Sequence, residues 1–200
     1  GALISNASLG AVLLRNSAGT TSYAFNAAGT ASLVGVPGFT LSGSLAARVN
    51  TTGGAVNESI TMPSGTPVSV IFAADDTAPV FKGSVTANAS GFASISGGFV
   101  VSRSTDRLTV AAAGVSAFVG AAGTGLQVSN GKLGVIVNTA ASKYALVASG
   151  NLALTGITGL TLAGSGAVRI NQLDEAINQT ITTPAGNVTL DFATADDVLT

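Results

Sequence analysis

Paired aspartates occur twice in the chain, each pair shortly after a short stretch of alternating apolar residues. The pairs are Asp75 with Asp76 and Asp196 with Asp197. Carboxylates clustered with backbone carbonyls are the ligands that a hard cation such as Ca²⁺ takes, so the pairs are candidate calcium sites at the ends of strands. The alternative is that each pair forms a turn in which the side-chain oxygens accept hydrogen bonds from loop amides.

Few residues of this chain are of a type that could catalyse a reaction. It contains no histidine and no cysteine, which removes the commonest general base, the thiolate nucleophile and the soft metal ligands. Asp191, just before the second aspartate pair, makes a carboxylate-based glycosidase the third-ranked function. Lysines lie beside no serine suited to be a nucleophile, and we expect them to be solvated: Lys82, Lys132 and Lys143. We predict that the chain is not an enzyme and needs no cofactor other than the candidate calcium.

The charge of the chain limits its partners. Charged residues make up only 8% of the sequence, against about 25% in an ordinary soluble domain, and the net charge is −1. There is no basic stripe to neutralise phosphates, so nucleic acid is not an expected partner. No run of 18 apolar residues is present, so no transmembrane helix is expected. With no tryptophan and two tyrosines, the chain also has few rings on which a sugar could stack.

We expect strands to position these residues. Apolar residues alternate with polar or small residues through most of the chain, which is the pattern of a β-strand. No stretch sustains the 3.6-residue apolar stripe of a helix, and we predict an all-β fold with most phenylalanines on inward rows. The alternation is clearest in residues 39–50, 68–72, 108–120, 126–138 and 188–192.

A long repeat organises the sequence. Residues 39–50 read FTLSGSLAARVN and residues 160–171 read LTLAGSGAVRIN, with Arg48 and Arg169 at matching places 121 residues apart (169 − 48). These arginines are expected on the solvent side of their strands, where a charge discourages edge pairing. The repeat divides the chain into a first copy (1–83), connecting strands (84–125) and a second, truncated copy (126–200).

The sequence also contains a second, weaker repeat with a shorter period, which we call the short echo. Similar alternating segments begin at Leu108, Leu126, Tyr144 and Leu160, roughly 16 to 18 residues apart. That interval suits a strand plus its turn, and it also suits one coil of a narrow β-solenoid. Tandem β-sandwich domains of about 120 residues would explain the long repeat equally well. A β-solenoid is favoured because a sandwich does not require the short echo, and tandem sandwiches are the alternative.

Three segments carry a resemblance to known proteins: residues 35–60, 104–120 and 156–181. They resemble repeats of giant, repetitive bacterial surface or secreted proteins of the adhesin-like kind. The resemblance implies a non-enzymatic structural segment outside the cell or on its surface, acting as a stalk, spacer or adhesin body. Its partners would be neighbouring repeats of the same or like chains. The alternative is a module that binds a glycan or a receptor on another cell.

Overall fold

The computed structural model describes residues 1–89, 92–193 and 197–199, and every regular element in them is a β-strand. The all-β prediction is therefore confirmed. The strands are β1 (Ala2–Arg15), β2 (Thr21–Leu33), β3 (Phe39–Asn50), β4 (Val56–Thr61), β5 (Pro67–Phe72), β6 (Val80–Ala89), β7 (Ala93–Arg103), β8 (Arg107–Ala121), β9 (Thr124–Asn138), β10 (Lys143–Thr155), β11 (Leu162–Asn171), β12 (Ile177–Thr183), β13 (Gly186–Phe192) and β14 (Asp197–Leu199).

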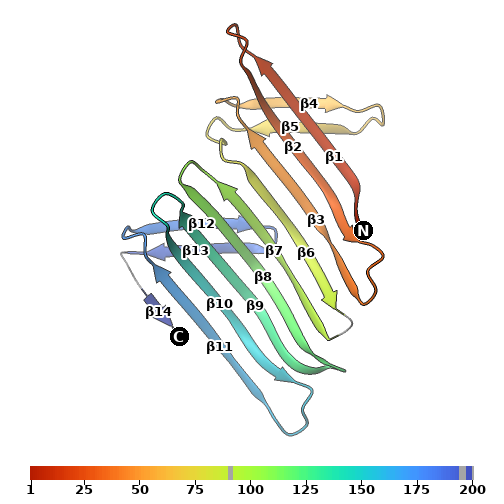
Figure 1. Ribbon diagram of the computed structural model, residues 1–200, viewed down its shortest axis with the longest axis vertical. Coiled ribbons are helices and arrows are strands. Elements are labelled where there is room, and N and C mark those ends of the chain that lie inside the picture. Colours follow the sequence, from red (N-terminus) through yellow and green to blue (C-terminus); the bar gives the residue numbers. More distant parts are fainter. Residues whose placement is uncertain (90–91, 194–196, 200) are drawn as a thin grey trace.

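Ten strands form one antiparallel sheet in the order β1-β2-β3-β6-β7-β8-β9-β10-β11-β14 (Figure 1). The order follows the chain except that two hairpins, β4–β5 and β12–β13, are inserted after β3 and after β11. Segments 1–83, 84–125 and 126–200 all contribute strands to this sheet.

The favoured β-solenoid is not confirmed. The described residues show neither stacked coils nor the two facing sheets of the alternative sandwich. The short echo of 16 to 18 residues instead corresponds to a long strand with a tight turn. Each turn reverses the chain, so successive strands pair antiparallel as a meander.

Stretches that share a sequence also share their strand pairing. Ala24 pairs with Asn50 between β2 and β3, and Ala145 pairs with Asn171 between β10 and β11. An irregularity near the start of β1 also returns in β9, since Asn6 and Asn130 have φ angles of 49° and 52°. The same register is thus produced twice by the same residue pattern.

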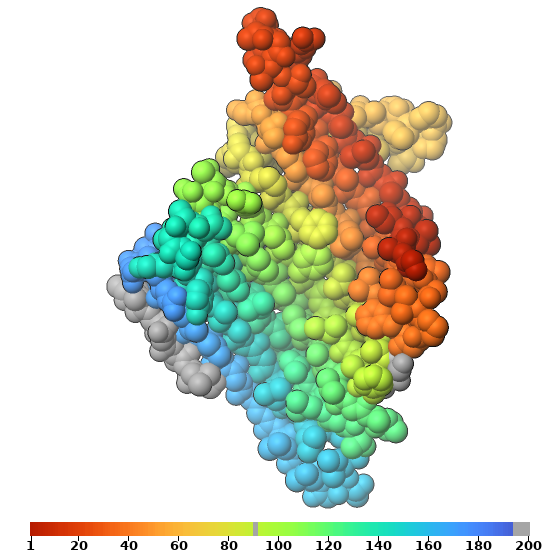
Figure 2. All heavy atoms as spheres, in the orientation of Figure 1, coloured from red at the N-terminus to blue at the C-terminus, as the bar shows by residue number. Residues whose placement is uncertain are grey.

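Both hairpins lie on one side of the sheet and run across its strands (Figure 1). The second hairpin, β12–β13, covers parts of β7, β8, β9 and β10 and forms the larger apolar core with them. The first hairpin, β4–β5, covers β2 and β1 and then projects past the outer edge of β1, as the space-filling view also shows (Figure 2). The core of the molecule is therefore the layer between each hairpin and the sheet.

The opposite face of the sheet is not covered by the described residues, and this leaves some of the phenylalanine side chains exposed. Phe72 and Phe192, which belong to the hairpins, are 5% and 2% exposed. Phe39 and Phe92 were also expected inward, yet they are 37% and 53% exposed. That prediction is wrong for them because alternation defines two rows of side chains but not which row another layer covers.

Candidate functional site

The first aspartate pair lies in the turn that follows β5. The backbone amide of Asp76 donates to the carbonyl of Ala73 at 3.2 Å, and that of Thr77 donates to the carbonyl of Asp75 at 2.9 Å. The Asp76 carboxylate lies 3.4 Å from Nη2 of Arg48. The side chains of Asp75 and Asp76 are exposed, and backbone carbonyls accept these turn hydrogen bonds, so a turn made by the aspartate side-chain oxygens stays a prediction.

Asp196 of the second pair lies outside the described residues, and Asp197 begins β14, where it pairs with Ile170. Among residues 1–89, 92–193 and 197–199, no group of three or more Asp, Glu, His or Cys side chains could hold a metal ion. Calcium at the aspartate pairs stays a prediction.

The residues considered for catalysis belong to different strands. Asp191 is an exposed residue of β13, opposite Asn178 of β12. Lys143 forms an ion pair with Asp174, whereas Lys82 and Lys132 are exposed on β6 and β9. The non-enzymatic reading stays a prediction.

The repeated arginines connect the sheet to the hairpins. Arg48, near the end of β3, donates from Nη2 to the carbonyl of Ile71 at 2.6 Å, and its guanidinium carbon lies 4.6 Å from the ring centroid of Phe72. We call this arrangement the arginine contact. Arg169 repeats it by donating to the carbonyl of Asp191 and lying 4.9 Å from the ring of Phe192.

The arginine contact corrects an expectation. Arg48 and Arg169 were expected to face solvent, but they lie on the side of the sheet that the hairpins cover. The planar guanidinium packs on an aromatic ring while its N–H groups bind a carbonyl, so its charge does not require full exposure. The arginines therefore hold the hairpins in place and do not act as charges against edge pairing.

Two asparagines turn the chain from the sheet into each hairpin. Asn50 is 2% exposed, donates from Nδ2 to the carbonyl of Gly54 at 2.9 Å and accepts from the amide of Thr52 at 3.0 Å. The second copy repeats both bonds, with Asn171 donating to Glu175 at 2.8 Å and accepting from Leu173 at 3.1 Å. We did not single out these asparagines from the sequence. The signal was the Arg-x-Asn spacing shared by residues 48–50 and 169–171.

The loop after each asparagine contains a residue with a left-handed backbone. It is Gly53 in the first copy, with a φ of 75°, and Asp174 in the second, with a φ of 57°. In the second copy the loop also forms ion pairs to the sheet, since Asp174 binds Lys143 of β10 and Glu175 binds Arg107 of β8. The second loop thus has two acidic residues in ion pairs at the positions that Gly53 and Gly54 occupy in the first loop.

Glycines allow each hairpin to approach the sheet backbone. A Cβ atom added to Gly134 of β9 would lie 2.8 Å from Cγ1 of Val188 and 2.8 Å from Cδ1 of Leu190. Gly10 of β1 has the same relation to the first hairpin, with Val70 at 2.7 Å and Val68 at 2.8 Å. Real Cβ atoms do not come this close, so the crossing points require glycine.

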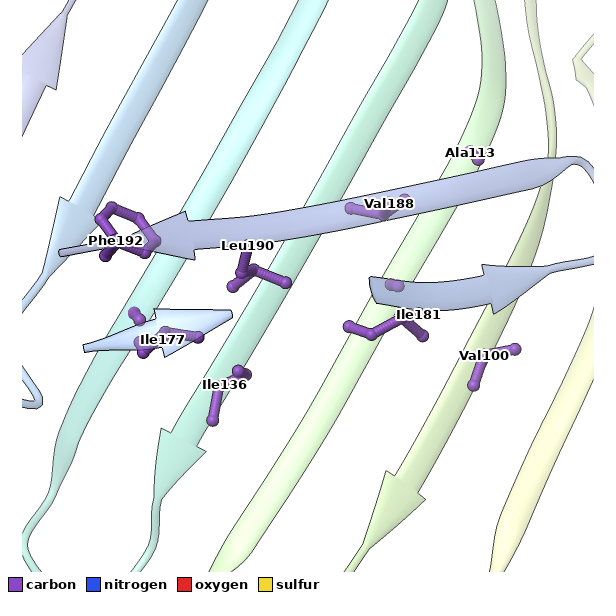
Figure 3. Close-up of a cluster of buried hydrophobic side chains, with 10 residues drawn as sticks. Val100, Ala113, Ile136, Ile177, Ile181, Val188, Leu190 and Phe192 are labelled. Carbon is purple, nitrogen blue, oxygen red and sulfur yellow. The ribbon is translucent and has the colours of Figure 1, made fainter. Parts of the chain in front are cut away.

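The apolar core under the second hairpin includes side chains from four strands of the sheet. Figure 3 shows its side chains beside those of the sheet. From the hairpin come Ile177, Ile181, Val188, Leu190 and Phe192, and from the sheet come Val100, Ala111, Ala113, Ile136 and Ala145. The alanines leave room for the larger hairpin residues, and the hairpin joins strands of the connecting segment to strands of the second copy.

The uncovered face carries an open groove of about 340 Å³ over β1, β2 and β3. Leu9, Ala27, Leu45 and Phe81 are among its almost wholly apolar lining residues. A glycan needs donors and acceptors for its hydroxyl groups as well as rings to stack on, and this lining offers few of them. The groove therefore does not favour the glycan-binding alternative.

No family model, curated protein or solved structure matches the chain. Its described residues form no helix of the length and apolarity needed to cross a membrane. The proposed function therefore rests on the geometry of the sheet and its hairpins.

Proposed function

We propose that the chain is a non-enzymatic structural segment of an extracellular or surface-anchored bacterial protein, where it acts as a stalk, spacer or adhesin body. Its role is to extend one sheet by adding copies of the same unit. Each unit contributes six sheet strands, as β1-β2-β3-β6-β7-β8 do before β9 begins the next copy, together with one crossing hairpin.

The observation that carries this proposal is the continuous pairing of the first six-strand unit with the second copy. β8 pairs with β9 along nearly its whole length, from Arg107 opposite Asn138 to Ala121 opposite Thr124. A ladder this long makes the second copy an extension of the first sheet. Separate domains joined by a linker would have no such ladder.

The crossing hairpins support a mechanical role. The second hairpin lies over strands on both sides of the junction between β8 and β9, so a force that separates those strands must also remove the hairpin from its core. Such an array shares one property with the β-solenoid that the sequence predicts. Each unit contacts only its neighbours, so the array can be lengthened without redesign.

Composition supports a location outside the cell. The chain has no cysteine and few charges, which suits an oxidising environment and close stacking of units. The resemblance to repeats of bacterial surface proteins points the same way. The partners in this proposal are neighbouring copies in the same or like chains.

Length per copy tests the spacer role. Neighbouring strands lie about 4.8 Å apart, so six strands should add about 29 Å along the sheet. Tandem chains with one to four additional 121-residue units should therefore appear by electron microscopy as rods of constant width that lengthen by about this amount per unit. Rods whose length does not follow unit number would overturn the spacer proposal.

Labelling tests the location. Antibodies raised against the folded chain should bind intact cells of the organism that produces it. Binding only after the cells are permeabilised would overturn the extracellular location.

A further inference from the structure

The two hairpins differ in burial at their outer halves, although their residues correspond. At the inner ends, Val56 and Ile177 are equally buried, at 6% and 5% exposed. At the outer ends the values diverge. Ile181, Val188 and Thr183 are 7%, 1% and 5% exposed, whereas their counterparts Ile60 and Val68 are half-buried and Met62 is 40% exposed.

The cause is the sheet beneath each hairpin. The outer half of the second hairpin rests on β7 and β8, where Ile181 packs with Val100 and Ala113. Its tip reaches so far that a Cβ atom on Gly98 of β7 would lie 2.7 Å from the backbone nitrogen of Ala185. In the first hairpin, Ile60 and Val68 lie over Gly10 of β1, and the part beyond them projects past β1, where no described strand lies under it (Figures 1 and 2).

The outer edge of β1 is exposed at the same place. Among the residues that the structure describes, β1 pairs only with β2, whereas its counterpart β9 pairs with β10 on one side and with β8 on the other. β1 also carries exposed apolar side chains, with Leu9 63% and Leu13 70% exposed. A long, apolar, unpaired strand edge is a template for another strand.

We propose that the outer edge of β1 and the outer half of the first hairpin form one docking surface, and that its occupant is a β-hairpin with the sequence of β7–β8 from a neighbouring copy. This inference deepens the proposed function and rests on it. The occupant would pair its β8-like strand with β1, would complete the cover of Ile60 and Val68 and would lie beneath Met62.

The fit of the tip supports this occupant over other strands. β7 and β8 provide glycines under the second hairpin, since Cβ atoms on Gly98 and Gly114 would lie 2.8 Å and 3.0 Å from Cβ of Ala185. The first hairpin has Ser64 at the matching place, which is also small. The second copy shows this pairing, because β9, the counterpart of β1, pairs with β8 from Arg107 opposite Asn138 to Ala121 opposite Thr124.

Met62 is the sole methionine of the chain and reports on this surface. The test joins a duplicate of residues 93–124 directly before Gly1, so that the turn between β8 and β9 precedes β1. Oxidation of Met62 by hydrogen peroxide, followed by mass spectrometry, should be roughly eightfold slower in the extended chain. This factor is the ratio of the 40% exposed fraction of Met62 to the 5% of Thr183.

A matched control carries Gly98→Val in the duplicated segment only. The added side chain takes the space of the hairpin tip, so oxidation should return to the rate of the unextended chain. Equal rates in the unextended and extended chains would overturn the proposal. Protection of Met62 that depends on concentration in the unextended chain would show that a second copy is the occupant, and it would overturn the choice of β7–β8.

A second measurement does not depend on the oxidation rate. Pairing with the duplicated β8 should slow hydrogen exchange at the backbone amides on the outer edge of β1, and unchanged exchange there would contradict the docking. Arrays that lengthen per copy without protection of Met62 would refute this surface alone. Protection without lengthening would refute only the proposed spacer function.

Discussion

The guanidinium carbon of Arg48 lies 4.6 Å from the ring centroid of Phe72, and the same guanidinium donates a hydrogen bond to the residue before that ring. Arg169 stands in the same relation to Phe192 in the second copy. Each hairpin is therefore attached to the sheet at its inner end by a cation–π contact and a hydrogen bond. This attachment recurs wherever a copy adds a hairpin.

Removing the arginine contact should loosen the hairpin. We expect Arg169→Gln to lower the free energy of unfolding by about 1–2 kcal/mol, because a cation–π contact and a charged hydrogen bond are both lost. Urea denaturation measures the loss. Arg103→Gln, at the exposed end of β7, is the matched control and should change stability by less than about 0.5 kcal/mol. Equal losses in the two variants would contradict the role given to Arg169.

Adding a methyl group at a crossing point should separate the hairpin from the sheet. Gly134→Ala places Cβ 2.8 Å from side chains of Val188 and Leu190, and overpacking of this kind costs about 1–3 kcal/mol. Gly164→Ala on β11 is the control, since no atom lies within 4 Å of its added Cβ. The control should be neutral or slightly stabilising because alanine loses less backbone entropy than glycine. Denaturation curves that place both variants on the same side of the parent would count against the crossing geometry.

Strand positions could be read from the sequence because alternation is a local property. Residues 39–50 coincide with β3, and residues 108–120 and 126–138 lie within β8 and β9. The repeat also predicted that Arg48 and Arg169 would occupy matching places, as they do. Each of these features depends on residues close together in the chain.

The covered face and the hairpin crossing could not be read in the same way. In β3 the row with Leu41 and Leu45 is the more apolar one, yet the row with Arg48 and Asn50 lies under the hairpin. The choice depends on contacts between segments far apart in the chain. A signal was available in Gly10 and Gly134, because a glycine inside a strand often marks the close approach of another backbone.

Calcium dependence tests the aspartate pairs. A bound ion at a hundredfold excess over Kd would stabilise the fold by about 2.7 kcal/mol. We expect a chelator to leave the melting temperature unchanged, because the turn satisfies its own amides and the Asp76 carboxylate already contacts Arg48. A melting temperature that falls with chelator, recovers with calcium but not with magnesium, and loses this response in Asp75→Asn would instead establish a calcium site.

The central claim is that the copies form one coupled sheet, and thermal melting of chains with different copy numbers tests it most directly. Each added 121-residue unit brings another β8–β9-type ladder and another crossing hairpin, so a nearest-neighbour term is added while the number of ends stays the same. Melting followed by circular dichroism should show a single transition whose midpoint rises with each of the first added units and then levels off. Units that melt independently, with a midpoint that does not change with copy number, would contradict the account.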